Sequence, residues 1–432
     1  MTYTLGSRRR ILYSTGNLGY TLPGFFTQTY LFIFYAPTSG RIIIPSFLVG
    51  ISFFLGTLVQ AIANPFVGNL SDKSRSRFGR RRFFIISGII PFVIFFILLW
   101  FPFETGIHGA VILSLVFVAY NFFFAYVVAP YLSLIPEIAS TPNERVRLTT
   151  IMAYFSIIGI ILASAMPVLF LGLGLSIQIV GLAMGFFILL SFLLVFFFTS
   201  ESVVSTKAPV EYTFKQAFLQ TFKNSMFNRF IVAYLAFQFG FYFLLSSLGY
   251  ITEDLVFPGN PHFESYVGIF TLIAILFAMG FSPAMIKYSD KYGEKKAFIV
   301  FTSILGISFL STFLLIFIPL DYRIFATILI MAVAGMGLTS YFILPNAILG
   351  EVIDRDEEIT GYRREAMYFS VQGLMERIPS SMAGLALGYW ITYVYLPHRS
   401  EVFIGLLGVI SGITLLITAL LFFRVPLPKK GI

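Results

Sequence analysis

Long apolar segments, separated by short polar stretches, dominate the chain and limit what it can fold into. An α-helix of about 20 residues crosses the ~30 Å hydrocarbon core of a bilayer. Only 11% of the 432 residues are charged, whereas a soluble domain carries about 25%. The sequence therefore predicts an all-α integral membrane protein with 12 transmembrane helices. The expected spans are approximately 11–36, 44–71, 81–101, 108–136, 147–172, 175–199, 227–252, 264–289, 296–318, 322–349, 363–394 and 402–424.

Lysine and arginine residues are distributed unequally between the two sides of the expected helices. Twelve spans place both termini on the same side, and that side carries 25 of the 29 basic residues. The opposite side carries 3, and Arg377 lies inside a span. Basic residues accumulate in the cytoplasmic loops of membrane proteins. We therefore expect a multi-pass protein of the cell (plasma) membrane with cytoplasmic N- and C-termini.

The composition also argues against several classes of function. The net charge of +9 does not indicate a nucleic-acid partner, because the basic residues lie in short loops between apolar segments. The chain has no cysteine, and its three histidines fall in predicted loops on one side. We therefore expect no disulfide, no metal site and no cofactor. Neither an ATP-binding P-loop nor a signal peptide is recognisable.

A membrane-embedded enzyme would need acidic residues and histidines clustered near one face. The candidates are Glu253, Asp254, His262 and Glu264. We interpret them as solvated charges of an outer loop, so we do not expect an enzyme.

Two motifs recur in the same order in both halves of the chain, at offsets of 218 and 215 residues. Such repetition indicates a duplicated unit of six helices. We expect an N-terminal bundle (1–199), a central cytoplasmic loop (200–226) and a C-terminal bundle (227–432). Two pseudo-symmetric bundles with a site between them are typical of alternating-access transporters. The motifs are Pro65-x6-Asp72-Lys73 with Pro283-x6-Asp290-Lys291, and Tyr126-x3-Pro130-x6-Glu137 with Tyr341-x3-Pro345-x5-Glu351.

The loops that follow Asp72 and Asp290 share one pattern: an acid at a helix end, a glycine turn and basic residues. This pattern resembles the cytoplasmic signature of the major facilitator superfamily (MFS), which implies the MFS fold. The acid can pair with an arginine or a helix N-terminus, and such pairs can break and re-form as the halves move. Ordinary helix capping is the alternative. The predicted cytoplasmic gate comprises Asp72, Arg80, Asp290, Asp354 and Arg363.

Three further polar motifs lie at cytoplasmic ends of the spans. They are Asn64-Pro65-x2-Gly68, Arg75-Ser76-Arg77-Phe78-Gly79-Arg80, and Val352-Ile353-Asp354-x-Asp356-Glu357-x2-Thr360-Gly361-x-Arg363-Arg364-Glu365. Together they resemble the glycoside–pentoside–hexuronide:cation symporters, the melibiose-permease-like family of the MFS. The resemblance implies cation-coupled uptake of a sugar or glycoside. We expect the acids of the last motif to pair with the basic loop at residues 75–82 when the cytoplasmic gate is closed.

Polar side chains inside the spans are costly in a bilayer and tend to face a cavity. Several recur every four residues, which places them on one helix face, as in the stripe Tyr234, Gln238, Tyr242 and Ser246. Amides, hydroxyls and aromatic rings can bind a sugar, although contacts between helices are the alternative use of such residues. The predicted substrate-binding residues in these spans are Asn17, Thr21, Gln28, Gln60, Asn64, Tyr126, Tyr154, Gln238 and Tyr242.

The family resemblance also implies charged residues that this chain lacks in its N-terminal half. Amides in their place bind Na⁺ weakly without a compensating charge and carry no proton near neutral pH. The positions that bind the cation hold Gln60 and Asn64, and the positions of the sugar-binding acids and arginine hold Thr21, Val128 and Ala153.

The eleventh span carries two charges, Glu376 and Arg377, where a charge costs most. An unpaired ion inside a membrane costs several kcal/mol, so pairing with another group or with substrate is expected. By the resemblance, Gln372 matches a family glutamine and Arg377 a lysine near the substrate site. We therefore predict that Gln372 and Arg377 bind substrate and that Glu376 is the coupling carboxylate. A structural arrangement that fixes this helix is the alternative.

These features predict a secondary active transporter that moves a sugar or glycoside by alternating access, with H⁺ or Na⁺ as the coupling ion. The missing carboxylates leave an alternative, an organic anion or an amphipathic lipid-like solute transported without coupling. We expect a monomer whose partners are its small-molecule substrate and the membrane lipids.

Overall fold

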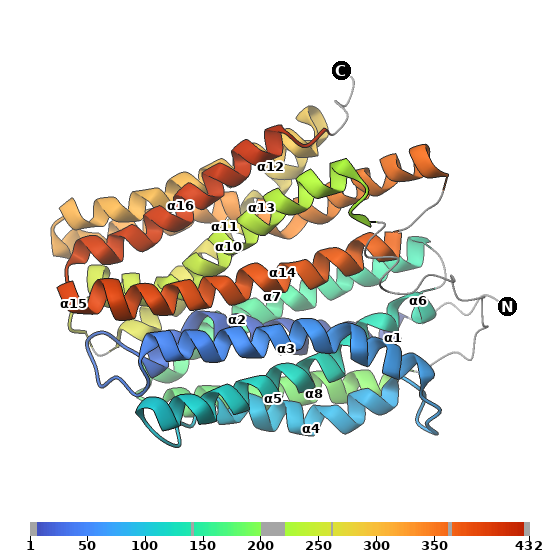
Figure 1. Cartoon of the computed structure of the whole chain (residues 1–432), viewed down its shortest axis with the longest axis horizontal. Coiled ribbons are helices and arrows are strands. Elements are labelled where there is room, and N and C mark those ends of the chain that lie inside the picture. The colour runs from blue at the N-terminus through green and yellow to red at the C-terminus, as the bar shows by residue number, and fades with distance from the viewer. Residues whose placement is uncertain (1–6, 140–141, 200–220, 261, 362–364, 427–432) are drawn as a thin grey trace. The chain divides into compact units, whose positions relative to one another are not determined.

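The structure is a computed structural model that describes residues 7–139, 142–199, 221–260, 262–361 and 365–426. Within these ranges every regular element is a helix. The chain divides into two compact units, Met1–Ala208 and Pro209–Ile432, which are described separately below (Figure 1). Most of the predicted central loop at 200–226 lies outside the described residues.

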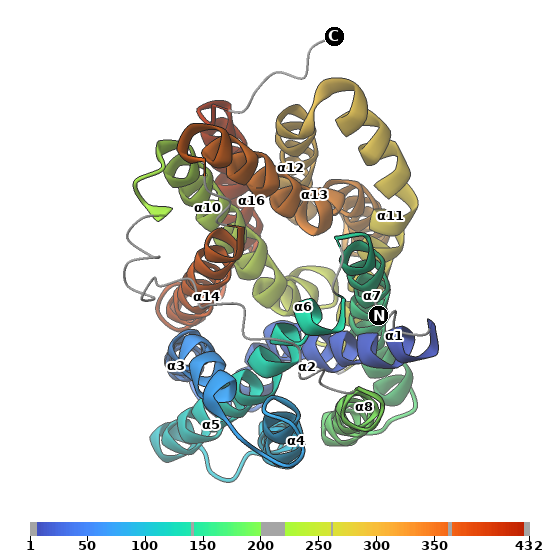
Figure 2. The ribbon, with the colours of Figure 1, turned by 90° about the vertical axis from the view of Figure 1, so that its right-hand side faces the viewer.

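The first unit is built around tightly packed aromatic helices. Helix α5 packs between α3 and α4, α4 packs on α8, and α2 contacts both α7 and α8 (Figure 2). The buried rings of Phe26 and Trp100 lie 4.2 Å apart, and Phe92 stacks on Tyr120 at 5.7 Å. Its elements are α1 (Ser7–Ser14), α2 (Gly16–Tyr35), α3 (Ser46–Lys73), α4 (Arg82–Leu98), α5 (Gly106–Ser133), α6 (Ile135–Ile138), α7 (Pro142–Gly172) and α8 (Ile177–Phe198).

The second unit places α16 between α10 and α12, while α14 packs on α10 and α13 packs on both α11 and α12. Its elements are α10 (Ser225–Ile251), the π-helix η1 (Thr252–Val256), α11 (Phe263–Tyr292), α12 (Glu294–Leu310), the 3₁₀-helix η2 (Ser311–Phe317), α13 (Leu320–Thr360), α14 (Glu365–Tyr389), the π-helix η3 (Trp390–Tyr395), α15 (Leu396–His398) and α16 (Glu401–Phe423).

Each predicted span coincides with one helix or with two consecutive helices. Nine helices in the described ranges are long and apolar enough to cross a membrane, and α4 is a shorter apolar helix of 17 residues. Helix α14 carries Gln372, Glu376 and Arg377, which lower its hydropathy. The chain is therefore a multi-pass membrane protein of the predicted all-helical class.

The tenth span differs most from its predicted bounds. It was expected to end at residue 349, but α13 continues to Thr360 and ends where Gly361 adopts a φ of 73°. The acidic motif that begins at Val352 is thus helical as far as Thr360, because polar residues outside the bilayer do not oppose helix formation. An ion pair between Arg355 and Glu358, 2.5 Å apart and three residues apart in sequence, supports this turn.

Both units show the same arrangement at a turn between two helices. Gly79 and Gly293, with φ of 98° and 87°, turn the chain into α4 and α12. Just beyond each turn a basic side chain reaches the end of the unit's last helix. Arg82 Nη2 donates to the Phe196 carbonyl at 2.6 Å, and Lys295 Nζ donates to the Phe423 carbonyl at 2.9 Å. A cation at these orphan carbonyls complements the helix dipole.

Candidate functional site

The carboxylate of Glu376 on α14 is held by two tyrosines of α10. Tyr234 donates its hydroxyl proton to Glu376 Oε2 at 3.1 Å, and Tyr242 donates to Oε1 at 3.0 Å. Gln238, midway between them, donates from Nε2 to the Tyr234 hydroxyl at 2.7 Å. The four-residue spacing places all three on the same face of α10. The predicted stripe of the seventh span therefore meets the predicted coupling carboxylate.

Neighbouring side chains extend this cluster along α14 and onto α13. Gln372, one turn before Glu376, is buried and hydrogen-bonds the Tyr234 side chain. Arg377 places its positive charge near the Tyr242 hydroxyl, which also hydrogen-bonds Tyr341. The cluster thus joins three helices of the second unit through amide, phenol and ionised groups.

Protonation of Glu376 would change how these helices are joined. As a carboxylate, Glu376 accepts from both phenols, whereas a protonated carboxyl carries one donor and keeps fewer acceptor positions. Taking up a proton would therefore rearrange at least one contact between α10 and α14.

In the first unit, Asn17 is fixed by other helices at both ends of its amide. Its Nδ2 donates to Ser156 Oγ on α7 at 2.8 Å, and Tyr131 on α5 donates to its Oδ1 at 3.1 Å. Thr21 donates to the Asn17 carbonyl one turn earlier. These contacts give Asn17 a role in joining α2, α5 and α7.

The other predicted polar residues of the first unit occupy varied surroundings. Gln28 and Gln60 are buried, and Asn64 is half-buried. Tyr126 lies against α4, with its hydroxyl 3.4 Å from Ser87 Oγ. Tyr154 on α7 is 62% exposed.

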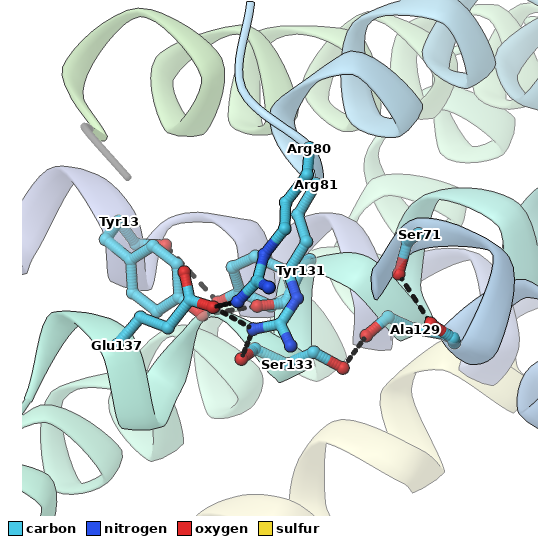
Figure 3. Close-up of polar contacts among 9 residues, drawn as sticks. Tyr13, Ser71, Arg80, Arg81, Ala129, Tyr131, Ser133 and Glu137 are labelled. Atoms are coloured by element: carbon cyan, nitrogen blue, oxygen red, sulfur yellow. Dashed lines mark hydrogen bonds and ion pairs between the residues drawn. The ribbon is translucent and has the colours of Figure 1, made fainter. Parts of the chain in front are cut away.

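At one end of the first unit, Glu137 on α6 pairs with two arginines (Figure 3). Arg80 forms an ion pair with Glu137, and Arg81 Nη1 lies 2.8 Å from its Oε1. Arg81 also donates to the Ser133 carbonyl at the end of α5. The sequence predicts Arg80 as a gate residue without its partner, although Glu137 is the last residue of one of the repeated motifs.

Of the other predicted gate residues, two are exposed at helix ends and two are not fully described by the structure. Asp290 and Asp354 are exposed at the ends of α11 and α13. The side chain of Asp72 and the whole of Arg363 lie outside the described part of the chain.

Asp356, from the acidic motif at residues 352–365, has a partner within its own unit. It is buried and accepts a hydrogen bond from Asn224 Nδ2 at 3.3 Å. Asn224 also caps α10, because its Oδ1 accepts from the Met226 and Phe227 amides. Asp356 therefore contacts the residue that caps the start of α10.

The structure corrects the interpretation of Glu253. Glu253 was expected to be a solvated loop charge but is 1% exposed, within the π-helix η1. Nearby, Arg323 is buried, donates to the Leu255 carbonyl at 2.8 Å and pairs with Glu401 at 3.0 Å. Across the described residues, no group of three or more His, Cys, Asp or Glu side chains is spaced to hold a metal ion.

Long apolar helices in two compact units, with the half-buried carboxylate of Glu376 held by tyrosines inside one of them, are typical of a membrane transporter of the MFS type. The sequence profile of the family described as "MFS/sugar transport protein" matches residues 12–429. The chain belongs to this family, and it is a transporter rather than an enzyme.

Relatives and solved structures agree with this assignment. The chain is 25% identical over 428 residues to the uncharacterized symporter YnaJ of Bacillus subtilis, covering 94% of this chain and 88% of that one. It is 24% identical to the glucuronide carrier protein homolog of Escherichia coli, covering 100% and 94%. The crystal structure of a substituted form of the nucleoside transporter NupG superimposes with a TM-score of 0.71 at 14% identity, covering 97% and 100%. This last likeness concerns the fold alone.

Proposed function

We propose that this protein carries a sugar or glycoside across the plasma membrane by alternating access, coupled to the movement of H⁺ or Na⁺. Membership of a sugar-transport family and the glucuronide carrier homolog among its relatives support the substrate class. The Glu376 cluster supports the coupling, because it is an ionisable group held by α10 side chains inside the second unit. The hydrogen bonds from Tyr234 and Tyr242 to Glu376 are the main observation behind the proposal.

In this proposal Glu376 binds the coupling proton and the surrounding polar groups bind substrate. Tyr242, Gln238, Gln372 and Arg377 supply hydroxyl, amide and guanidinium groups for sugar hydroxyls. A proton on Glu376 releases a phenol donor, which is then available to the sugar. Substrate and proton therefore favour each other's binding, as symport requires. Candidate contacts in the first unit are Asn17, Thr21, Gln28, Gln60, Asn64, Tyr126 and Tyr154.

The membrane arrangement in this proposal follows from the charge distribution. Both termini and the basic loops lie in the cytoplasm, since 25 of the 29 basic residues fall on that side. Asp72, Arg80, Asp290, Asp354 and Arg363 belong to the cytoplasmic gate. The protein acts as a monomer, with bundles at 1–199 and 227–432, and needs no cofactor.

Uptake into proteoliposomes tests the coupling. A panel of sugars and sugar acids is measured with imposed H⁺ or Na⁺ gradients for the wild type, Glu376→Gln and Arg377→Ala. We expect Glu376→Gln to abolish stimulation by a proton gradient while substrate exchange at equilibrium persists. Arg377→Ala should raise the KM. The exposed carboxylate at the start of α13 gives the matched control, Asp321→Asn. Full proton dependence in Glu376→Gln would exclude this coupling role.

A second candidate function rests on the charge of Arg377 and on the absence of acids deep in the first six spans. These features favour an organic anion or an amphipathic lipid-like solute, transported without coupling. In the same assay, competition by carboxylated or amphipathic solutes but not by neutral sugars would support it. Insensitivity to both ion gradients would identify uncoupled transport.

A further inference from the structure

A groove opens between the ends of α10 and α16, on the side where the chain's basic loops lie. Its volume is about 600 Å³. The floor and walls combine exposed apolar surface with two arginines. The lining residues are Ser225, Asn228, Arg229 and Val232 from α10, with Leu421 and Arg424 from the end of α16.

The groove is electropositive. Arg229 and Arg424 are both exposed, and Arg229 Nη1 donates to the Arg424 carbonyl at 3.2 Å, which brings the two residues together. The six lining residues include no acid. The first turn of α10 and the last turn of α16 both border the groove, so the opposite ends of two helix dipoles offset each other and the two arginines supply its charge. An anion is therefore the ligand that this charge pattern selects.

The apolar part of the groove continues onto the surface that faces lipid. Val232 is 56% exposed one turn into the span, and Leu420 and Phe423 are exposed beside the lining residue Leu421. A soluble anion such as inorganic phosphate would gain nothing from this surface. A phospholipid would place its phosphate at the arginines and its acyl chains along the valine and leucine.

We propose that this groove binds an anionic membrane phospholipid, with the phosphate between Arg229 and Arg424. A guanidinium matches phosphate in charge and in its paired hydrogen-bond geometry. Basic pockets between transmembrane helices on the cytoplasmic side commonly hold anionic headgroups. The bound lipid ties the beginning of α10, which carries the Glu376-binding tyrosines, to the end of α16. This proposal is independent of the transported substrate.

The purified full-length protein in neutral detergent tests the proposal by thermal unfolding and native mass spectrometry. Phosphatidylglycerol, phosphatidylcholine and inorganic phosphate are each titrated. We expect phosphatidylglycerol to raise the Tm of the wild type and to remain bound in the mass spectrum, and the other two to do neither. The Arg229→Gln/Arg424→Gln variant should bind phosphatidylglycerol about thirtyfold more weakly.

Two further variants separate a built site from general surface charge. Arg145→Gln/Arg147→Gln removes the same charge from exposed positions at the start of α7 and should keep the lipid effect. Arg229→Lys/Arg424→Lys keeps the charge and should restore part of the binding. Equal loss in the α7 variant, or unchanged binding in Arg229→Gln/Arg424→Gln, would overturn the proposal. A similar shift with inorganic phosphate alone would show a phosphate site rather than a lipid site.

Discussion

Glu376 is connected by hydrogen bonds to the polar stripe on α10, which comprises Tyr234, Gln238 and Tyr242. The spacing of Tyr234, Gln238 and Tyr242 is local information, and it predicted that they share a helix face. Their partner lies 142 residues from Tyr234 and 134 from Tyr242 in sequence. The free-energy cost of a charge inside a membrane singled out Glu376 in the sequence, but nothing local in the sequence connects it to this face of α10.

Removing the Tyr242 hydroxyl should show how much its hydrogen bond to Glu376 contributes to transport. Tyr242→Phe keeps the ring and loses one of the two donors to Glu376. A hydrogen bond to a charged group contributes about 1.5–3 kcal/mol, so proton-driven uptake should fall about tenfold or more. Uptake in proteoliposomes measures the effect.

The same substitution in a Glu376→Gln background provides the internal control. If the phenol acts through the carboxylate, Tyr242→Phe should add little to the loss already caused by Glu376→Gln. Tyr322→Phe, at an exposed tyrosine of α13, should leave uptake unchanged. Additive losses in the double variant would mean that Tyr242 acts independently of Glu376.

At the scale of elements, the positions of the helices could be predicted from the sequence, whereas their exact ends and their contacts with one another could not. Apolar length indicated where the helices lie, but the end of α13 depends on a left-handed glycine after a charged helical turn. The close approach of α12 and α16 depends on another pair of glycines. A Cβ on Gly412 would lie 2.6 Å from the Gly306 carbonyl oxygen, and one on Gly306 would lie 3.0 Å from the Gly412 carbonyl oxygen. Small residues allow such contact between membrane helices.

Filling this contact should separate the two helices. Gly412→Val would place side-chain atoms against backbone that cannot move aside, and overpacking of this kind costs about 1–3 kcal/mol. We expect a lower Tm in detergent, measured by thermal unfolding. Gly280→Val is the matched control, because a Cβ at this helical glycine meets nothing within 4 Å. Equal destabilisation by both variants would assign the effect to helix propensity instead of packing.

At the scale of the whole molecule, membrane orientation is the most accessible prediction. The chain has no cysteine, so single cysteines can be introduced without a background signal. Tyr322 is 64% exposed at the start of α13, and Ile359 is 75% exposed near its other end. In intact cells an impermeant maleimide should label Tyr322→Cys at once. Ile359→Cys should react only after the membrane is permeabilised, and the reverse pattern would invert the proposed topology.

The sequence by itself determined the membrane class, the helix pattern and the resemblance to the sugar symporters. These properties follow from composition, local periodicity and short motifs, which need no knowledge of distant contacts. The tertiary structure decided which side chains meet: Glu376 with the tyrosines of α10, Glu137 with Arg80 and Arg81, and Arg229 beside Arg424. The physical reason is that a side chain's partner is chosen by helix packing, and helix packing joins residues that lie far apart in the chain.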